Sequence, residues 1–432
     1  MTASALRREL GRWDLTAIGV NQVIGGAVFA QPSLYAASVG AWSPWMVAIA
    51  GVASMLIALS FAEVSSRFDA TGGPYLCTRA AFGRFAAFEV GWMLWFTRAA
   101  SWAAVINALA AALGFYAPAL TSGWPRATLI TTIIVAITAI NVRGIRQSSL
   151  VLNILTIGKL LPLAMFIIVG LAAVDPSRLA LGDAPPLPQL SATGLLLIFA
   201  FGGYEVIPVP AGEAKDPRRA VPFALTATIA IVTVVMTLAQ VVALGTLPGL
   251  ASSTTPLADA AAMFMGASGA AMLTIGAVFS MTGNNMGQAL SGSRNMFALA
   301  EQGDLPGVFG RVHPTFRTPV VAIVVTSTVS LVLALSGHYA QLALASAISR
   351  LIVYVATCAS TLRLRSPRFA GTVSPPTFVV PFGPVIPAAA IVVALTILAG
   401  ARANQLVAGA IALAVGAILY AIAVRRGRFQ LT

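Results

Sequence analysis

The sequence predicts an all-α integral membrane protein that crosses the bilayer twelve times, and three observations support this fold class. Of its 432 residues, 58% are hydrophobic and 9% are charged, and the mean hydropathy is +0.89. A soluble domain has about 25% charged residues, so a soluble enzyme and a disordered scaffold are both excluded. The other two observations are the number of long apolar segments and the distribution of basic residues between them.

Apolar segments of about 20 residues are long enough to cross the hydrocarbon core of a bilayer. The first six predicted spans cover Leu15–Ala37, Pro44–Ser66, Phe85–Leu113, Ala127–Asn141, Leu150–Val174 and Ala192–Gly212. The other six cover Val221–Leu244, Gly269–Leu299, Pro319–Leu335, Leu342–Leu362, Val379–Ala399 and Leu406–Val424. The fourth and ninth are short. We expect residues 1–432 to form a single membrane domain.

The basic residues fall mainly on one side of these spans. The net charge is +13 and the pI is about 10.9, which in a soluble protein would suggest a nucleic acid partner. Of the 26 lysines and arginines, however, 20 lie on the side that both termini share. The opposite loops hold Arg126, Arg178 and Arg402, and the spans themselves hold Arg98, Lys159 and Arg350. Because basic loops stay cytoplasmic, we expect a cell-membrane protein with cytoplasmic termini and no nucleic acid partner.

Sequence motifs for enzyme chemistry are missing. The two cysteines and two histidines are far apart, and the sequence has no metal-ligand spacing, phosphate-binding loop or nucleophile elbow. The basic segment Met1–Asp14 lacks a signal-peptide cleavage site and is interpreted as a cytosolic tail. We therefore expect no cofactor, no metal and no enzyme activity.

Two of the spans carry helix-breaking residues in matching places. The first contains Gly25 and Gly26 before Pro32, and the sixth contains Gly202 and Gly203 before Pro208. Glycine and proline both disfavour a helix interior, although membrane helices also use glycine for close packing. Because five spans separate the two breaks, the second unit enters the membrane from the opposite side. The sequence predicts an inverted repeat of five plus five helices, residues 15–174 and 192–362, with 379–424 appended.

Interrupted helices at corresponding positions indicate a binding site near the membrane midplane. Backbone N–H groups of Gly26, Ala27 and Val28 favour a carboxylate there. Backbone carbonyls around Phe201 and Gly202 favour an ammonium group. Such a site suits the backbone of an α-amino acid.

Several stretches resemble the amino acid–polyamine–organocation (APC) transporter superfamily. The stretch Val23–Phe29 resembles its first-helix signature, and Phe201–Glu205 with Gly212–Pro222 resembles its sixth helix and the following loop. Further similarity lies in Ser293–Arg294, Gly303–Pro306, Thr318–Pro319 and Gly72–Gly83. The sequence departs from the pattern at Asp69, where members usually have proline, and at Cys77, where they have an aromatic residue. The resemblance implies a LeuT-like five-plus-five fold, uptake or exchange of amino acids or amines, and often proton coupling.

Lys159 lies nine residues into the fifth span, about 14 Å along the helix. Snorkelling to the interface is difficult from that depth, so a partner or a water-filled cavity is expected. Two roles remain open, and both can apply. The ammonium group ties the fifth helix to unwound carbonyls of the first, or it titrates because burial disfavours its charge. In proton-coupled members of the family, a lysine at the matching position takes the place of a sodium ion.

Glu205 directly follows the second break. Either it is a carboxylate favoured by a helix N-terminus, or it faces the cavity and takes up a proton. The resemblance to arginine–agmatine exchangers implies the second role, and it places Phe199 as an aromatic lid, with core packing as the alternative. The predicted substrate site is Ile24, Gly25, Gly26, Ala27, Val28, Phe199, Phe201, Gly202, Gly203 and Glu205, and the proton-coupling residues are Lys159 and Glu205.

The remaining polar residues of the spans are expected to bond helix to helix. We expect pairing between helices for Arg98, Arg350, Glu89 and Glu63. Two roles remain open for four amide side chains: interhelical hydrogen bonding or lining of the cavity. These residues are Asn21, Gln22, Asn284 and Asn285.

Together these features predict a secondary transporter of amino acids or related amines that works by alternating access, coupled to protons and independent of sodium. The partners are then the amino acid or amine, a proton and the lipid bilayer. The alternatives are a sodium-independent exchanger without net proton movement and a membrane sensor that binds amino acids without transporting them.

Overall fold

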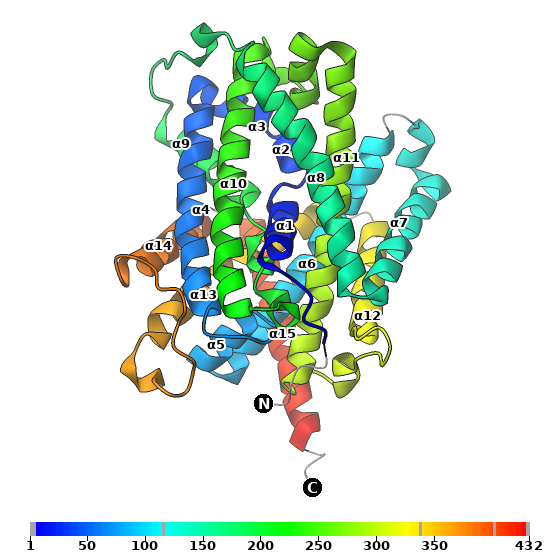
Figure 1. Ribbon diagram of the computed structural model, residues 1–432, viewed down its shortest axis with the longest axis vertical. Coiled ribbons are helices and arrows are strands. Elements are labelled where there is room, and N and C mark those ends of the chain that lie inside the picture. The colour runs from blue at the N-terminus through cyan, green and yellow to red at the C-terminus, as the bar shows by residue number, and fades with distance from the viewer. Residues whose placement is uncertain (1–5, 115–116, 337–338, 401–402, 429–432) are drawn as a thin grey trace.

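Helices account for the architecture of the described part of the chain (Figure 1). The computed structural model describes residues 6–114, 117–336, 339–400 and 403–428. The first half contains α1 Arg12–Val23, α2 Ala27–Ala30, α3 Pro32–Val39, α4 Ser43–Ser65, α5 Pro74–Phe82, α6 Arg84–Gly114, α7 Gly123–Arg143, α8 Ile145–Leu171 and α9 Leu187–Ala200. The second half contains α10 Pro217–Thr246, α11 Pro256–Glu301, α12 Val320–Leu335, α13 Tyr339–Leu364, α14 Val385–Ala399 and α15 Ala403–Arg428.

Short 3-10 turns join these helices. They are η1 Gly40–Trp42, η2 Pro118–Thr121, η3 Pro176–Leu179, η4 Tyr204–Val206, η5 Val209–Glu213, η6 Leu250–Ser252, η7 Gly307–Gly310 and η8 Pro367–Phe369. Proline stands at the first position of α5, α10 and α11, where its missing N–H costs no helical hydrogen bond. β-Pairing among the described residues is limited to two isolated bridges, one of which pairs Leu10 with Ala214.

Within the described residues, six helical segments are long and apolar enough to cross a membrane. They are Pro32–Ser65, Arg84–Leu113, Gly123–Arg143, Ile145–Leu171, Pro217–Thr246 and Pro256–Glu301, and shorter apolar helices cover Val320–Leu335, Val385–Ala399 and Leu406–Ile422. The exposed side chains of α8 form one apolar face: Leu150, Ile154, Ile157, Leu161, Met165 and Ile168. A face of this kind is unfavourable in water and is stable against lipid. The protein is therefore a helical membrane protein.

Several helices extend beyond the predicted spans, among them α7 and α11. The predicted span Ala127–Asn141 lies inside the longer helix α7, Gly123–Arg143. Helix α11 begins at Pro256 rather than near Gly269, and it bends at Gly266, whose φ is +64°. Asp259 fixes the start of this helix by accepting hydrogen bonds from the hydroxyls of Ser253 and Thr255. Because polar residues surround the N-terminus of α11, apolar patterning alone does not predict that the helix begins at Pro256.

Helix α1 lies in the middle of the molecule and packs against α8, α10 and α11 (Figure 1). Glycines on α11 permit this close approach. A Cβ atom added to Gly283 would lie 2.2 Å from the side-chain oxygen of Asn21, and one added to Gly287 would lie 2.2 Å from the amide nitrogen of Gln22. The polar residues of α1 therefore lie directly against the backbone of α11.

Candidate functional site

The first predicted helix is interrupted at its centre. Helix α1 ends at Val23, and α2 begins at Ala27 after three residues without helical structure. The backbone N–H groups of Gly26, Ala27 and Val28 donate no hydrogen bond to any described residue. Gly26 and Ala27 are also partly exposed. Three unpaired donors therefore lie together at the start of the second half of this helix.

Side chains from two other helices bind the carbonyl groups that the interruption frees. The ammonium group of Lys159 on α8 donates to the carbonyl oxygens of Ile24 at 2.6 Å and Val20 at 3.4 Å. The hydroxyl of Ser280 on α11 donates to Ile24 at 2.7 Å and to Gly25 at 3.0 Å. Lys159 is fully buried. These contacts supply the hydrogen bonds that unwound backbone needs inside a membrane.

Amides on α1 and α11 bond the two helices on the N-terminal side of the interruption. Asn284 donates to the carbonyl oxygens of Asn21 at 3.2 Å and Gln22 at 3.0 Å. Gln22 donates in return to the carbonyl oxygen of Asn284 at 2.9 Å. Asn21 also donates to the carbonyl oxygen of Leu152 on α8 at 2.9 Å. Asn285 differs, because its buried side-chain amide has no partner among the described residues.

A second interruption follows α9, which ends at Ala200. Gly203 has φ +130°, a conformation that side chains disfavour, and an added Cβ would lie 2.7 Å from the carbonyl oxygen of Gln22. The second interruption therefore packs against the last turn of α1, directly before the first interruption. The carbonyl oxygens of Phe201 and Gly202 accept no hydrogen bond from any described residue. The backbone of Phe199 lies in α9, but its side chain is outside the described residues, so its role as a lid stays a prediction.

Glu205, in η4, lies at the centre of a buried charged cluster that we define as Arg98, Glu205, Arg350 and Tyr354. One carboxylate oxygen is 2.6 Å from Nη2 of Arg98 on α6 and 2.9 Å from Nε of Arg350 on α13. The other oxygen accepts hydrogen bonds from the Tyr354 hydroxyl and the Gly203 N–H, both at 2.8 Å. The side chains of Arg98, Glu205 and Arg350 are 0%, 1% and 10% exposed. Pairing between helices is thus present for both arginines.

Sequence reasoning missed two members of this region, Tyr354 and Ser280. Tyr354 stacks on Tyr204 with ring centroids 5.3 Å apart, and Phe61 packs edge-on against both rings. A signal for both residues exists in the sequence. Tyr354 lies four residues after Arg350, and Ser280 lies four residues before Asn284, so each shares a helix face with a residue that was identified.

The two remaining intramembrane carboxylates differ. Glu63 accepts two hydrogen bonds from Arg365, at 2.6 and 2.5 Å, and one from the N–H of Val380 at 2.8 Å. The predicted pairing is wrong for Glu89, whose two buried oxygens have no hydrogen-bond partner among the described residues. Glu89 instead faces α15, where a Cβ atom on Gly416 would lie 2.6 Å from its carboxylate. The neighbouring helix presents no donor at that position.

Loop segments that carry the family resemblance contact one another. Asp304 accepts hydrogen bonds from the Tyr75 hydroxyl at 2.6 Å and from Arg79 at 2.9 Å. Burial, reinforced by the Asp304 carboxylate, raises the pKa of Tyr75.

Burial also raises the pKa of Cys77, on the same short helix α5, to about 12. The unusual residue Cys77 therefore fills a packed position as a neutral thiol.

A second buried ion pair ties the segment after the sixth predicted span to α11. The carboxylate of Glu213 accepts two hydrogen bonds from Arg294, at 2.9 and 3.1 Å, and both side chains are 0% exposed. Arg294 also donates to Asn141 on α7 at 2.7 Å. The carbonyl oxygen of Glu213 accepts the N–H of Leu10 at 2.9 Å. The two residues thereby connect four segments that are distant in the sequence.

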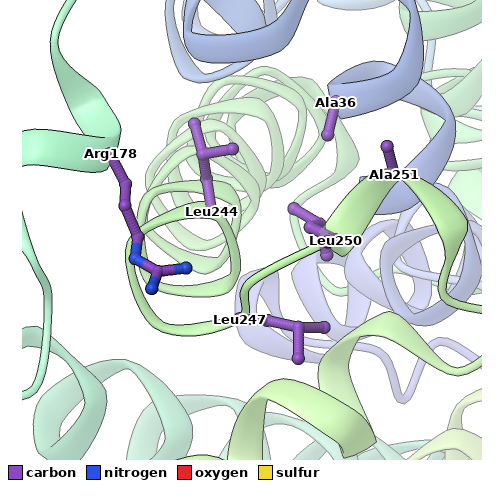
Figure 2. A pocket seen from close by; sticks show the side chains of 7 residues that line it. Ala36, Arg178, Leu244, Leu247, Leu250 and Ala251 are labelled. Carbon is purple, nitrogen blue, oxygen red and sulfur yellow. The ribbon is translucent and has the colours of Figure 1, made fainter.

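A pocket of about 250 Å³ lies away from the interruptions, between the C-terminal end of α10, η6 and α3 (Figure 2). Its lining residues are Ala36, Arg178, Leu244, Leu247, Gly249, Leu250 and Ala251. Figure 2 shows that Arg178 supplies the only polar atoms among the labelled side chains. Within the described residues, no group of three metal-ligating side chains occurs.

The protein has two interrupted helices that pack together within a bundle of apolar helices. This arrangement is typical of membrane transporters whose binding site is formed by discontinuous helices. The comparisons agree with this class. A family model described as amino acid permease matches residues 10–423. The chain therefore belongs to the amino acid permease family of the APC superfamily.

Named relatives are similar along most of their length. The branched-chain amino acid permease BcaP of Bacillus subtilis (strain 168) is 28% identical over 444 residues, which cover 96% of this chain and 93% of the relative. The serine/threonine exchanger SteT of the same strain is 28% identical over 370 residues, covering 82% and 81%. An uncharacterized transporter of Mycobacterium tuberculosis (strain ATCC 25618 / H37Rv) is 32% identical over 372 residues, covering 83% and 81%.

Proposed function

We propose that this protein is a secondary transporter that carries amino acids or related amines across a cell membrane by alternating access. The observation that carries the proposal is the packing of the second interruption against the end of α1, next to the first interruption. Among the described residues, the N–H groups of Gly26, Ala27 and Val28 at the start of the second half of the first helix have no partner, and neither do the carbonyls of Phe201 and Gly202 in the second interruption. Donors on one side and acceptors on the other complement the carboxylate and ammonium groups of an α-amino acid.

The rest of the predicted site completes this backbone recognition. Ile24 and Gly25 present carbonyl oxygens that Lys159 and Ser280 hold in place. Gly203 brings the second interruption against Gln22, in the last turn of α1 before the first interruption. Glu205 anchors the turn that follows it, because its carboxylate accepts the N–H of Gly203.

The membrane topology that we propose has twelve spans, arranged as inverted repeats over residues 15–174 and 192–362 with residues 379–424 appended. The positions of α1 and α15 support an even number of crossings, since the chain enters the first and leaves the last at the same end of the molecule (Figure 1). We place that end in the cytoplasm because 20 of the 26 basic residues share its side of the predicted spans.

Coupling to protons is proposed at Lys159, with Glu205 as a second site. The ammonium group of Lys159 bonds two carbonyl oxygens of α1, so its loss of a proton would weaken the contact between α8 and the interruption. A sodium ion would compete for the same oxygens, which supports sodium independence. Exchange without net proton movement is the second candidate, favoured by the relative named as a serine/threonine exchanger. A sensor would use the same site without transport.

Uptake by the full-length protein in proteoliposomes tests the proposal. A panel of labelled amino acids and amines is offered under an inward proton gradient, an inward sodium gradient or no gradient. We expect proton-driven uptake that sodium does not stimulate. Exchange that occurs only with internal substrate would support the exchanger, and the absence of uptake and exchange for every panel member would refute transport of these substrates.

Two variants test the coupling residues, and one lysine serves as a control. We expect Lys159→Ala and Glu205→Gln to lose the dependence on the proton gradient. Lys215→Ala is the matched control, because Lys215 is exposed and contacts Leu10 only through its backbone N–H. Unchanged gradient dependence in both test variants would contradict the coupling assignment and leave the proposed substrate site intact.

A further inference from the structure

The charged cluster around Glu205 contains two positive charges and one negative charge. Arg98 and Arg350 both contact the same carboxylate oxygen of Glu205, at 2.6 and 2.9 Å. Its second oxygen already accepts hydrogen bonds from Tyr354 and from the N–H of Gly203. Because the guanidinium group of arginine stays protonated in proteins, these three charged side chains carry a net charge of +1.

Arg98 also has more donors than acceptors around it among the described residues. A guanidinium group has five N–H donors and no acceptor. Besides Glu205, Arg98 reaches the side-chain oxygen of Gln22 at 3.4 Å. Its Nε atom is buried and has no partner among the described residues, and the whole side chain is 0% exposed. A buried donor without a partner points to an acceptor that the polypeptide itself does not supply.

The cluster adjoins the proposed substrate site. Gly203 links the two regions, because its N–H bonds to Glu205 while its α-carbon packs against the carbonyl of Gln22. Gln22 lies two residues before the interruption at Ile24. On the other side of that interruption lies Lys159, to which the proposed function assigns proton coupling and which adds a positive charge only in its protonated form. The two arginines and Glu205 alone already leave an excess of one positive charge beside the interruptions.

An excess positive charge is costly in a region of low dielectric constant, and an anionic ligand offsets that cost. A zwitterionic substrate would leave the balance unchanged, and a cationic substrate would increase the excess. We propose that the transported substrate is an anionic amino acid, one whose side chain carries a second carboxylate that binds at the Arg98–Arg350 side of the site. This inference rests on the proposed function and narrows its substrate class. Arg350 is the less buried of the two arginines, at 10% exposure against 0% for Arg98, so the proposal assigns it the contact with the substrate carboxylate.

The test uses isosteric pairs of substrates that differ in charge. Uptake of glutamate and glutamine, and of aspartate and asparagine, is measured in proteoliposomes with the full-length protein, with arginine as the cationic member. We expect kcat/KM for the acids to exceed that for their amides by about tenfold or more, because hydrogen bonds between charged groups are the stronger ones. We expect arginine to be the poorest substrate.

The outcomes separate this inference from the function on which it rests. Equal or better transport of the amides would overturn the inference and leave the transporter assignment standing. If no panel member is taken up, both the anionic-substrate inference and the transporter proposal are overturned. A thermal-shift measurement on the unmodified protein adds a binding readout, in which glutamate is expected to raise the unfolding temperature more than glutamine at equal concentration.

Substitutions at Arg350 test whether its charge selects the substrate. We expect Arg350→Gln to raise KM for the acidic substrates about tenfold or more, with a smaller effect on the amides, while Arg350→Lys retains the preference. Arg178→Gln is the matched control, since Arg178 is 35% exposed and pairs with Asp175 in a loop. An equal loss for acids and amides in Arg350→Gln would mean that the cluster only ties helices together, and it would overturn the proposal.

Discussion

Lys159 donates a hydrogen bond to the carbonyl oxygen of Ile24 at 2.6 Å, although 135 residues separate the two in the sequence. The same oxygen accepts a second hydrogen bond from Ser280 at 2.7 Å. One carbonyl group of the first interruption is therefore bound by side chains from α8 and α11 at once. Movement of Ile24 away from α8 or from α11 would lengthen one of these two bonds.

Removal of the Ser280 hydroxyl should weaken this attachment without changing the charge of the site. We expect Ser280→Ala to lower the free energy of unfolding by about 1 kcal/mol and to raise KM for substrate several-fold, since Ile24 and Gly25 each lose a donor. Thermal unfolding in detergent and uptake kinetics measure the two effects. Ser291→Ala is the control on the same helix, because its hydroxyl bonds only to the carbonyl of Gly287 within α11. Equal changes in KM for the two variants would contradict the prediction.

The contact between the second interruption and the end of α1 depends on the missing side chain of Gly203. We expect Gly203→Ala to abolish uptake and to reduce the yield of folded protein, since its Cβ would lie 2.7 Å from the backbone oxygen of Gln22 at a φ of +130°. Gly194→Ala on α9 is the matched control, because its Cβ would meet no atom closer than 3.7 Å. That control should gain up to about 1 kcal/mol of helix stability. Normal uptake by Gly203→Ala would show that the two backbones are further apart than described.

The buried pair Glu213–Arg294 should show strong coupling between its two members. Removal of one partner leaves an uncompensated buried charge, which costs about 3–5 kcal/mol. We therefore expect Arg294→Met to unfold at a much lower temperature than the wild type and the double variant Arg294→Met/Glu213→Leu to recover part of the loss. Additive losses in the double variant would indicate that the two side chains act independently, contrary to their contacts of 2.9 and 3.1 Å.

Local sequence patterns predicted the interruptions but not the partners of Glu205. The glycine pairs at residues 25–26 and 202–203 act on their own backbone, so their effect is visible in a few consecutive residues. The arginines that contact Glu205 lie 107 and 145 residues away on two different helices. Helix faces can be assigned from spacing, but the rotation of one helix against another is set by tertiary packing. For that reason Arg98 and Arg350 were expected to pair without a named partner.

Tertiary packing also explains why the predicted partner of Glu89 is missing. A carboxylate within a membrane helix is expected to pair with a donor, and this rule correctly anticipated a partner for Glu63. At Glu89 the adjacent surface belongs to α15, which presents Gly416 there instead of a donor. Which helix covers a residue cannot be read from the residue's own neighbours in the sequence.

The thiol of Cys77 should react slowly with alkylating reagents at neutral pH. Burial raises its pKa to about 12, and the thiolate is the reactive form. We expect labelling of the native protein by a maleimide to remain slow from pH 7 to pH 9 and to become fast in denaturant, where the thiol is exposed and its pKa returns to an ordinary value. The experiment uses the Cys358→Ser variant, in which Cys77 is the remaining cysteine. Mass spectrometry measures the extent of labelling. Rapid labelling of the native protein at pH 7 would contradict the burial of Cys77.

Glu63 and Glu89 should respond in opposite ways to the loss of their negative charge. Glu63→Gln removes a charge that Arg365 contacts twice, at 2.6 and 2.5 Å, and leaves this arginine without its anion. Glu89→Gln removes a charge that has no hydrogen-bond partner among the described residues, so the desolvation cost of that charge disappears with it. We expect the unfolding temperature in detergent to fall for Glu63→Gln and to stay constant or rise for Glu89→Gln. A fall of similar size in both variants would mean that Glu89 has a charged or donor partner in the folded protein, since only such a partner would make the loss of its charge destabilising.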